Sequence, residues 1–203
     1  MMKEMYINYK NELKKRNSIL LLIIILFIIG IIFGSIYITI LNNDQKLNVL
    51  KKVGEYYKSF NKMTFDGKID IFKNSLYSNF IYIISIWILG ISVIGLPIIF
   101  IMTFFKSFIF GFSISSIFAK YKLKGLLKVF LYLFPCNIIL ILYVILLACY
   151  SVSVSIKVFK GAIFKQNINF KTFMGKYFLL LLIGILISVL SSLYFAFIEP
   201  MFY

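Results

Sequence analysis

Histidine is absent from the 203 residues, and acidic residues are scarce, with seven Asp and Glu against 22 Lys and Arg. Without histidine there is no Ser–His or Cys–His pair and no HExxH zinc motif. The long apolar runs hold no pair of carboxylates, and the sequence has neither a Walker motif nor a cluster of metal ligands. We therefore expect a protein that is not an enzyme and that binds no cofactor or metal.

Cysteine is rare as well, with two residues, Cys136 and Cys149. Both fall in one predicted helix, where thirteen residues separate them by about 20 Å along the axis. A disulfide needs Cα atoms within roughly 7 Å of each other. The two cysteines are therefore predicted to be unpaired.

Polar sequence is in short supply, because 62% of the residues are hydrophobic and 14% are charged. A soluble domain of this length needs far more polar surface, and the continuous apolar runs do not alternate as the strands of a β-barrel would. The predicted fold class is all-α: a polytopic transmembrane helical bundle of about five spans, forming one integral membrane domain over residues 1–203. The expected spans are residues 18–41, 76–94, 97–119, 126–155 and 177–198.

What the chain does have is positive charge, with a net charge of +15. The basic residues flank the apolar runs, which favours anionic lipids as a partner. No basic stripe with interleaved aromatics lies outside those runs, so nucleic acid is not expected. The charge bias does not orient the chain, since ten basic residues fall on one expected side and eleven on the other. The first span favours a cytoplasmic N-terminus.

Residues 42–75 are the one sizeable polar segment, and they face outside if the N-terminus lies inside. Apolar residues recur in it at helical spacing, at Leu47, Leu50, Val53, Tyr57 and Phe60. This spacing predicts an amphipathic extracytoplasmic segment between spans 1 and 2, lying either on the membrane surface or as a solvated connector helix. The Asp66-Gly67 pair that follows indicates a turn.

Small residues interrupt two of the spans in patterns that permit close helix contact. Gly30 and Gly34 form a GxxxG motif, and Ser107, Gly111 and Ser115 lie at positions i, i+4 and i+8 of the third span. A GxxxG spacing also occurs by chance in apolar helices. The serine and glycine stripe would serve either packing within the bundle or contact between subunits of a homo-oligomer.

Proline and glycine mark the breaks in the middle of the chain. Gly95 and Pro97 divide the long run 76–119, which indicates either two crossings with a tight turn or a broken, re-entrant pair. Pro135 removes a helical hydrogen bond, and Asn137 is placed to satisfy a freed carbonyl or to bond across helices. A plain structural kink is the alternative to a ligand site there.

Lys106 is the one lysine deep inside an apolar run, near the middle of the third span. A lysine at the bilayer centre costs about 2.5–3.5 kcal/mol. Beyond residue 70 the one acid is Glu199, which lies near the end of its span and is a doubtful partner. Lys106 therefore either faces a polar interior and makes an interaction there, or snorkels to an interface.

Together, these residues resemble those of the stage II sporulation protein M family. The resemblance is carried by GISVIGLPIIFIMTFFKSFIFGF, KLKGLL and LFPCNIILI, which contain Gly95, Pro97, Lys106, Gly111, Gly125, Pro135 and Asn137, and by GIIFG in the first span. Ser107 departs from the family pattern, which generally has glycine after the lysine. Since a small residue is kept, we expect the packing there to survive.

The resemblance implies a scaffold rather than a catalyst. It would anchor and localise the stage II sporulation proteins D and P, which cut and remodel peptidoglycan, at the sporulation septum of the mother-cell membrane during engulfment. The segment 42–75 and the core 89–137 would bind those partners. The alternative is an accessory role in membrane transport, export or bacteriocin maturation, with Lys106 and Asn137 lining a pathway.

Overall fold

The computed structural model describes residues 2–60, 64–133, 136–164 and 170–202. It describes side chains over residues 16–60, 64–131, 136–161 and 174–201. Within these ranges the chain is helical and contains no strand, which confirms the predicted all-α class. The helices are α1 (Met2–Ile40), α2 (Asn43–Phe60), α3 (Phe65–Ile91), α4 (Gly95–Tyr121), α5 (Gly125–Leu133), α6 (Cys136–Phe164) and α7 (Phe170–Leu193). Short turns of other helix types follow α4, at Lys122–Lys124, and α7, at Tyr194–Ile198 and Glu199–Phe202.

Five helical stretches are long and apolar enough to cross a membrane, as the sequence predicted. They are Arg16–Ile40, Phe65–Ile91, Gly95–Leu131, Cys136–Gly161 and Met174–Met201. A helix rises about 1.5 Å per residue, so roughly 20 residues cover the hydrocarbon core while satisfying their own backbone groups. Large apolar side chains such as Leu21, Ile109 and Leu186 point outward along these stretches. The fold is that of a multi-pass membrane protein whose outer surface is suited to lipid.

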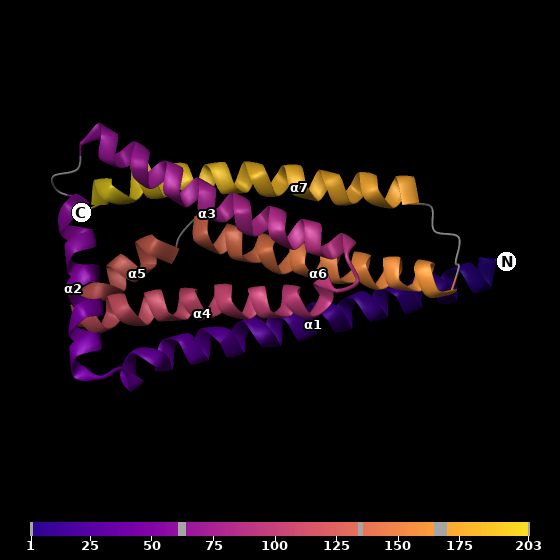
Figure 1. Cartoon of the computed structure of the whole chain (residues 1–203), viewed down its shortest axis with the longest axis horizontal. Coiled ribbons are helices and arrows are strands. Elements are labelled where there is room, and N and C mark those ends of the chain that lie inside the picture. The colour runs from indigo at the N-terminus through magenta and orange to yellow at the C-terminus, as the bar shows by residue number, and fades with distance from the viewer. Residues whose placement is uncertain (1, 61–63, 134–135, 165–169, 203) are drawn as a thin grey trace.

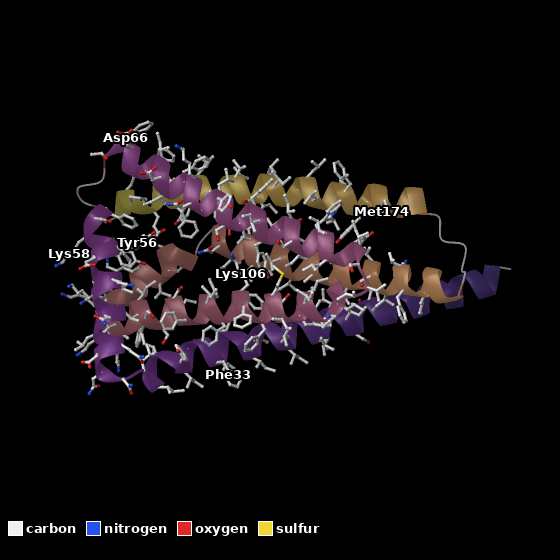
Figure 2. The ribbon with its side chains drawn as sticks, in the orientation of Figure 1. Phe33, Tyr56, Lys58, Asp66, Lys106 and Met174 are labelled. Carbon is white, nitrogen blue, oxygen red and sulfur yellow. The ribbon has the colours of Figure 1, made fainter. Side chains whose placement is uncertain are left out.

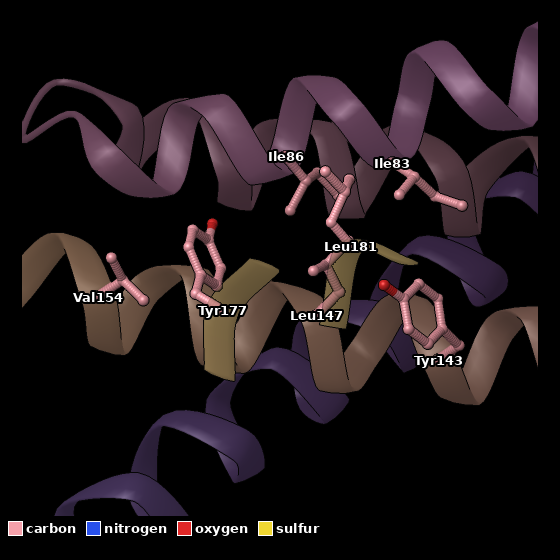
Figure 3. Packing of buried hydrophobic residues seen from close by; sticks show 7 residues of the cluster. All are labelled: Ile83, Ile86, Tyr143, Leu147, Val154, Tyr177 and Leu181. Atoms are coloured by element: carbon pink, nitrogen blue, oxygen red, sulfur yellow. The ribbon is translucent and has the colours of Figure 1, made fainter. Parts of the chain in front are cut away.

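Helix α6 is the centre of the bundle and contacts α1, α3, α4 and α7 (Figure 1). One buried cluster joins it to α3 and α7, and Figure 3 shows Leu147 and Tyr143 of α6 beside Ile83, Ile86 and Leu181. A second cluster joins α6 to α1 and α4. The described cysteines, Cys136 and Cys149, are both free, as predicted, and Cys149 is buried in this second cluster.

Helix α2 lies across one end of the bundle (Figure 1). The C-terminal part of its apolar face is covered by protein, because Tyr57 and Phe60 are buried and pack with Ile117 of α4, whereas Leu47 is exposed. The Lys128 ammonium of α5 lies 4.5 Å from the centre of the Tyr57 ring, a cation–π contact. The predicted amphipathic helix is therefore an end cap on the bundle, and its opposite face carries the exposed lysines.

The expected turn at Asp66-Gly67 is wrong, because these residues lie in the first turn of α3. Thr64 is the N-cap, and its side-chain oxygen accepts a hydrogen bond from the Gly67 amide at 3.4 Å. The Asp66 carboxylate lies at the positive end of the helix dipole, where it stabilises the helix start. Helix α3 therefore begins well before the apolar run from which its span was inferred.

The stretch expected as one span over 126–155 is divided between two helices, α5 and α6. The chain turns at Lys122, whose φ of 51° is the one positive value found for a non-glycine residue in the described chain. Gly125 is the first residue of α5. A side chain at this position would crowd α4, because an added Cβ would lie 3.1 Å from both the Ile117 carbonyl oxygen and the Tyr121 Cβ. Pro135, the expected kink, lies outside the described residues.

Candidate functional site

Helices α1 and α4 meet along a line of small residues that we call the α1–α4 seam: Gly30, Gly34, Ser35, Ser107, Gly111 and Ser115. At each glycine of the seam the opposite helix occupies the place of a side chain. A Cβ on Gly34 would overlap the Phe108 carbonyl, one on Gly111 would overlap the Ile31 carbonyl, and one on Gly30 would overlap Ser107 Oγ. The two backbones therefore approach as closely as glycine alone allows.

Two serines tie the seam together with hydrogen bonds between helices. Ser115 Oγ donates to the Ser35 carbonyl at 2.9 Å, and Ser35 Oγ donates to the Gly111 carbonyl at 3.3 Å. Between transmembrane helices such bonds contribute about 1 kcal/mol each. Since both stripes of small residues face each other within one chain, neither is available as a contact between subunits.

The pairing of Gly30 with Ser107 predicts a compensating substitution. Gly30→Ala alone places a methyl group on Ser107 Oγ and should destabilise the protein by about 1–3 kcal/mol. Adding Ser107→Gly removes that oxygen but leaves the Phe104 carbonyl 2.8 Å from the new methyl group, so the double variant should recover part of the loss, about 1 kcal/mol at most. The measurement is unfolding in sodium dodecyl sulfate, followed by the emission of Trp87, the single tryptophan. Strictly additive losses would show that the two positions do not compete for the same space.

The α3–α4 connection is a tight turn, and it shows why Gly95 and Pro97 occur there. Ser92 N donates to the Leu89 carbonyl at 3.0 Å and Gly95 N to the Ser92 carbonyl at 3.2 Å, while a Cβ on Gly95 would overlap the Leu89 carbonyl. Pro97 is the third residue of α4, where a missing amide costs no helical bond. Ser155 Oγ of α6 holds the turn by donating to the Ser92 carbonyl at 2.6 Å. Each of α3 and α4 is long enough to cross by itself, which favours two crossings over a re-entrant pair.

Lys106, labelled in Figure 2, lies near the middle of α4 and contacts two residues of α3. Its ammonium nitrogen donates to Asn79 Oδ1 at 3.3 Å and lies 4.9 Å from the centre of the Tyr82 ring. Tyr82 is held in turn by its hydroxyl, which donates to the Met102 carbonyl at 3.3 Å. No carboxylate pairs with Lys106 among the side chains that the structure describes. The lysine thus makes polar contacts inside the membrane, and both are with neutral groups.

Glu199, set aside as a partner for Lys106, is a second ionisable residue enclosed by the bundle. Its side chain is fully buried, and neither carboxylate oxygen has a hydrogen-bond partner in the described structure. Lys128 and Tyr194 lie close enough to interact electrostatically with it. The sequence shows a carboxylate near the end of an apolar span. It does not show that this carboxylate is fully buried, because nothing local indicates that Leu131 and Lys128 of α5 come close to Tyr194 and Glu199.

Asn137 is buried near the start of α6, one residue after Cys136, where the helix begins. The expected kink at Pro135 with a compensating Asn137 amide lies outside the described residues. The described side chains contain no group of three or more His, Cys, Asp or Glu residues that would hold a metal ion.

An aromatic joint between α3, α6 and α7 was not anticipated from the sequence. Trp87 stacks on Tyr177 with ring centres 5.3 Å apart, and Tyr150 stacks on Tyr177 at 5.9 Å. The Trp87 indole donates to the Tyr177 carbonyl at 3.1 Å, and the Tyr177 hydroxyl donates to the Trp87 carbonyl at 2.7 Å. Ser151 Oγ lies 2.8 Å from the same hydroxyl. Aromatic residues in an apolar sequence carry no periodic signal that would single these three out.

Comparison with known proteins places the chain in a family. The family model described as stage II sporulation protein M matches residues 23–201. That range includes the α1–α4 seam, the α3–α4 turn, Lys106 and Glu199. No curated protein and no solved structure matches the chain. Because the match covers most of the sequence, the chain belongs to the stage II sporulation protein M family.

Proposed function

We propose that the protein is a non-enzymatic membrane scaffold that anchors and localises peptidoglycan hydrolases at the sporulation septum during engulfment. The observation that carries this proposal is the family match over residues 23–201, which spans the bundle from α1 to the C-terminal turn. The partners expected from the family resemblance are the stage II sporulation proteins D and P. A bundle held by glycine contacts and buried hydrogen bonds supports a rigid holder.

The surface best suited to those partners is the outward face of α2. Tyr57 and Phe60 fasten the helix to the bundle end, so its other side is presented in a defined orientation. That side carries exposed Tyr56, a residue type enriched at protein contacts, and exposed Lys52 and Lys58, which would attract an acidic partner surface. With the N-terminus in the cytoplasm, this face lies on the extracytoplasmic side, where peptidoglycan is.

Both ends of the bundle also carry lysines that suit anionic lipid headgroups. Lys160 and Lys176 are exposed near the connection between α6 and α7, and Lys122 and Lys124 follow α4 at the α2 end. Each such charge contributes about 1 kcal/mol of attraction near an anionic surface. Anionic lipids are therefore proposed as a second class of partner, at either surface of the membrane.

A charge-reversal pair tests the α2 surface. Lys52→Glu with Lys58→Glu should reduce co-purification of the stage II sporulation proteins D and P from sporulating cells about tenfold, because like charges then meet at the contact. Lys160→Glu with Lys176→Glu makes the same change in net charge at the opposite end and should leave recovery unchanged. The measurement is the amount of each partner recovered per amount of this protein.

Two results would contradict the proposal. Equal recovery of both partners with either double variant would exclude the α2 face as their docking surface. Degradation of cell wall by the purified protein alone would exclude a non-enzymatic scaffold.

A further inference from the structure

Lys106 stands at the border between the bundle interior and the lipid. Along α4 it lies three residues after Thr103, which is fully buried, and three before Ile109, which is 58% exposed. Residues three apart on a helix are about 60° apart around its axis, so Lys106 lies between the inward and the lipid-facing sides. Its side chain is itself half-buried. Lys106 therefore borders the side of α4 against which a neighbouring helix in the membrane can pack.

The charge of Lys106 is not matched within the described chain. The five carboxylates among the described side chains are Asp44, Glu55, Asp66, Asp70 and Glu199. The first four lie in α2 or early in α3, at the α2 end of the bundle, and none of the five forms an ion pair with Lys106. The Asn79 amide and the Tyr82 ring orient the ammonium group but do not neutralise it. Charged residues inside a membrane pair with one another or with backbone carbonyls, and an ionisable group there marks a functional contact.

Lipid phosphates are poorly placed to be that partner. Eleven residues separate Lys106 from Gly95, which is about 16 Å along the helix, and the distance to the other end of α4 is greater. Snorkelling serves lysines near helix ends. The contacts to Asn79 and Tyr82 also direct the ammonium group across to α3 at the same depth, and not along α4 toward a surface.

We propose that Lys106 is a docking point for a transmembrane helix of a partner protein that carries an aspartate or glutamate at mid-membrane depth. The partner helix would lie against α3 and α4, which diverge from their tight turn toward the α2 end (Figure 1). On α3 the exposed Ser78, one turn before Tyr82, leaves room for close approach. Lys106 lies within the core 89–137 that the family resemblance assigns to partner binding, but the inference depends neither on the α2 face nor on which protein supplies the helix.

The test uses the full-length protein in vesicles of zwitterionic lipid and a leucine-rich single-span peptide with one central Glu. The peptide contains no tryptophan and carries a dansyl group, which accepts energy from Trp87. Trp87 is on α3, eight residues from Asn79, so its quenching reports binding beside Lys106. The Glu peptide should bind wild-type protein about tenfold more tightly than a matched Gln peptide, since charged pairing adds to the helix contact. Lys106→Met should abolish the difference, and Lys106→Arg should keep it.

Three outcomes would overturn the proposal. One is equal quenching of wild-type protein by the Glu and Gln peptides, a comparison that needs no variant to fold. Another is an undiminished preference for the Glu peptide in Lys106→Met. The third is loss of the preference when anionic lipid replaces part of the zwitterionic lipid, which would identify a lipid headgroup as the counter-charge.

Discussion

Gly34→Ala is expected to lower the free energy of unfolding by about 3 kcal/mol, the upper part of the range for overpacking a close contact. The added methyl group would overlap the Phe108 carbonyl and meet its carbonyl carbon and the Phe112 amide. These are backbone atoms of α4, so no side-chain rotation relieves the clash, and the helices must separate. Separation would also break the Ser115–Ser35 and Ser35–Gly111 hydrogen bonds.

The matched control is Gly175→Ala in α7. A Cβ on Gly175 has no neighbour within 4 Å, so the substitution adds helix propensity without a clash. It should leave stability unchanged or raise it by up to about 1 kcal/mol. Both variants are measured in the same detergent titration, with Trp87 emission as the signal. A Gly34→Ala protein as stable as the Gly175→Ala protein would mean that α1 and α4 do not meet along the seam.

Tyr177→Ala is expected to destabilise the protein by about 3–5 kcal/mol, as other large-to-small aromatic substitutions in cores do. The fully buried ring stacks between Trp87 and Tyr150, and its hydroxyl satisfies the Trp87 carbonyl and Ser151. Truncation leaves a cavity and removes these bonds together. Tyr177→Phe keeps the ring and should cost about 1–2 kcal/mol for the lost hydroxyl alone.

Trp87 provides a local readout for this substitution, because it is the single tryptophan and lies in the joint itself. Its emission should change in folded Tyr177→Ala protein, before any unfolding. Tyr77→Ala is the control. Tyr77 lies on α3, the helix that carries Trp87, and its side chain is 69% exposed on the outer surface of the bundle. If Tyr77→Ala and Tyr177→Ala alter stability and emission equally, the joint has no special role in holding α3 to α7.

Prediction from the sequence succeeded where the signal is local. The length and polarity of each apolar run predicted the all-α bundle of five spans, and the spacing of Cys136 and Cys149 predicted free thiols, because both depend on a single helix. The resemblance to the sporulation family rested on short motifs and is confirmed by the family match. The scaffold role, the hydrolase partners and the lipid contacts stay predictions, as does the orientation of the N-terminus.

Local patterns misled where a distant part of the chain supplied the partner. Asp66-Gly67 has the composition of a turn, yet both residues lie in the first turn of α3, and the Thr64 side chain caps that helix by accepting a hydrogen bond from Gly67. The segment 42–75 contains the amphipathic helix that was predicted, but the sequence did not show that α4 and α5 pack against one side of it. A sequence window contains neither the cap geometry nor the surface on which an amphipathic helix packs.

By itself, then, the amino-acid sequence determined that this protein resides in a membrane, crosses it as helices, lacks the residues of the common hydrolytic sites and belongs to its family. Only the tertiary structure decided that Gly30 and Gly34 face Ser107 and Gly111, that Lys106 meets Asn79 and Tyr82, and that Glu199 is enclosed. The physical reason is the range of the interactions. Helix formation in lipid depends on neighbouring residues, whereas these contacts join positions that are distant in the chain and come together when the helices pack.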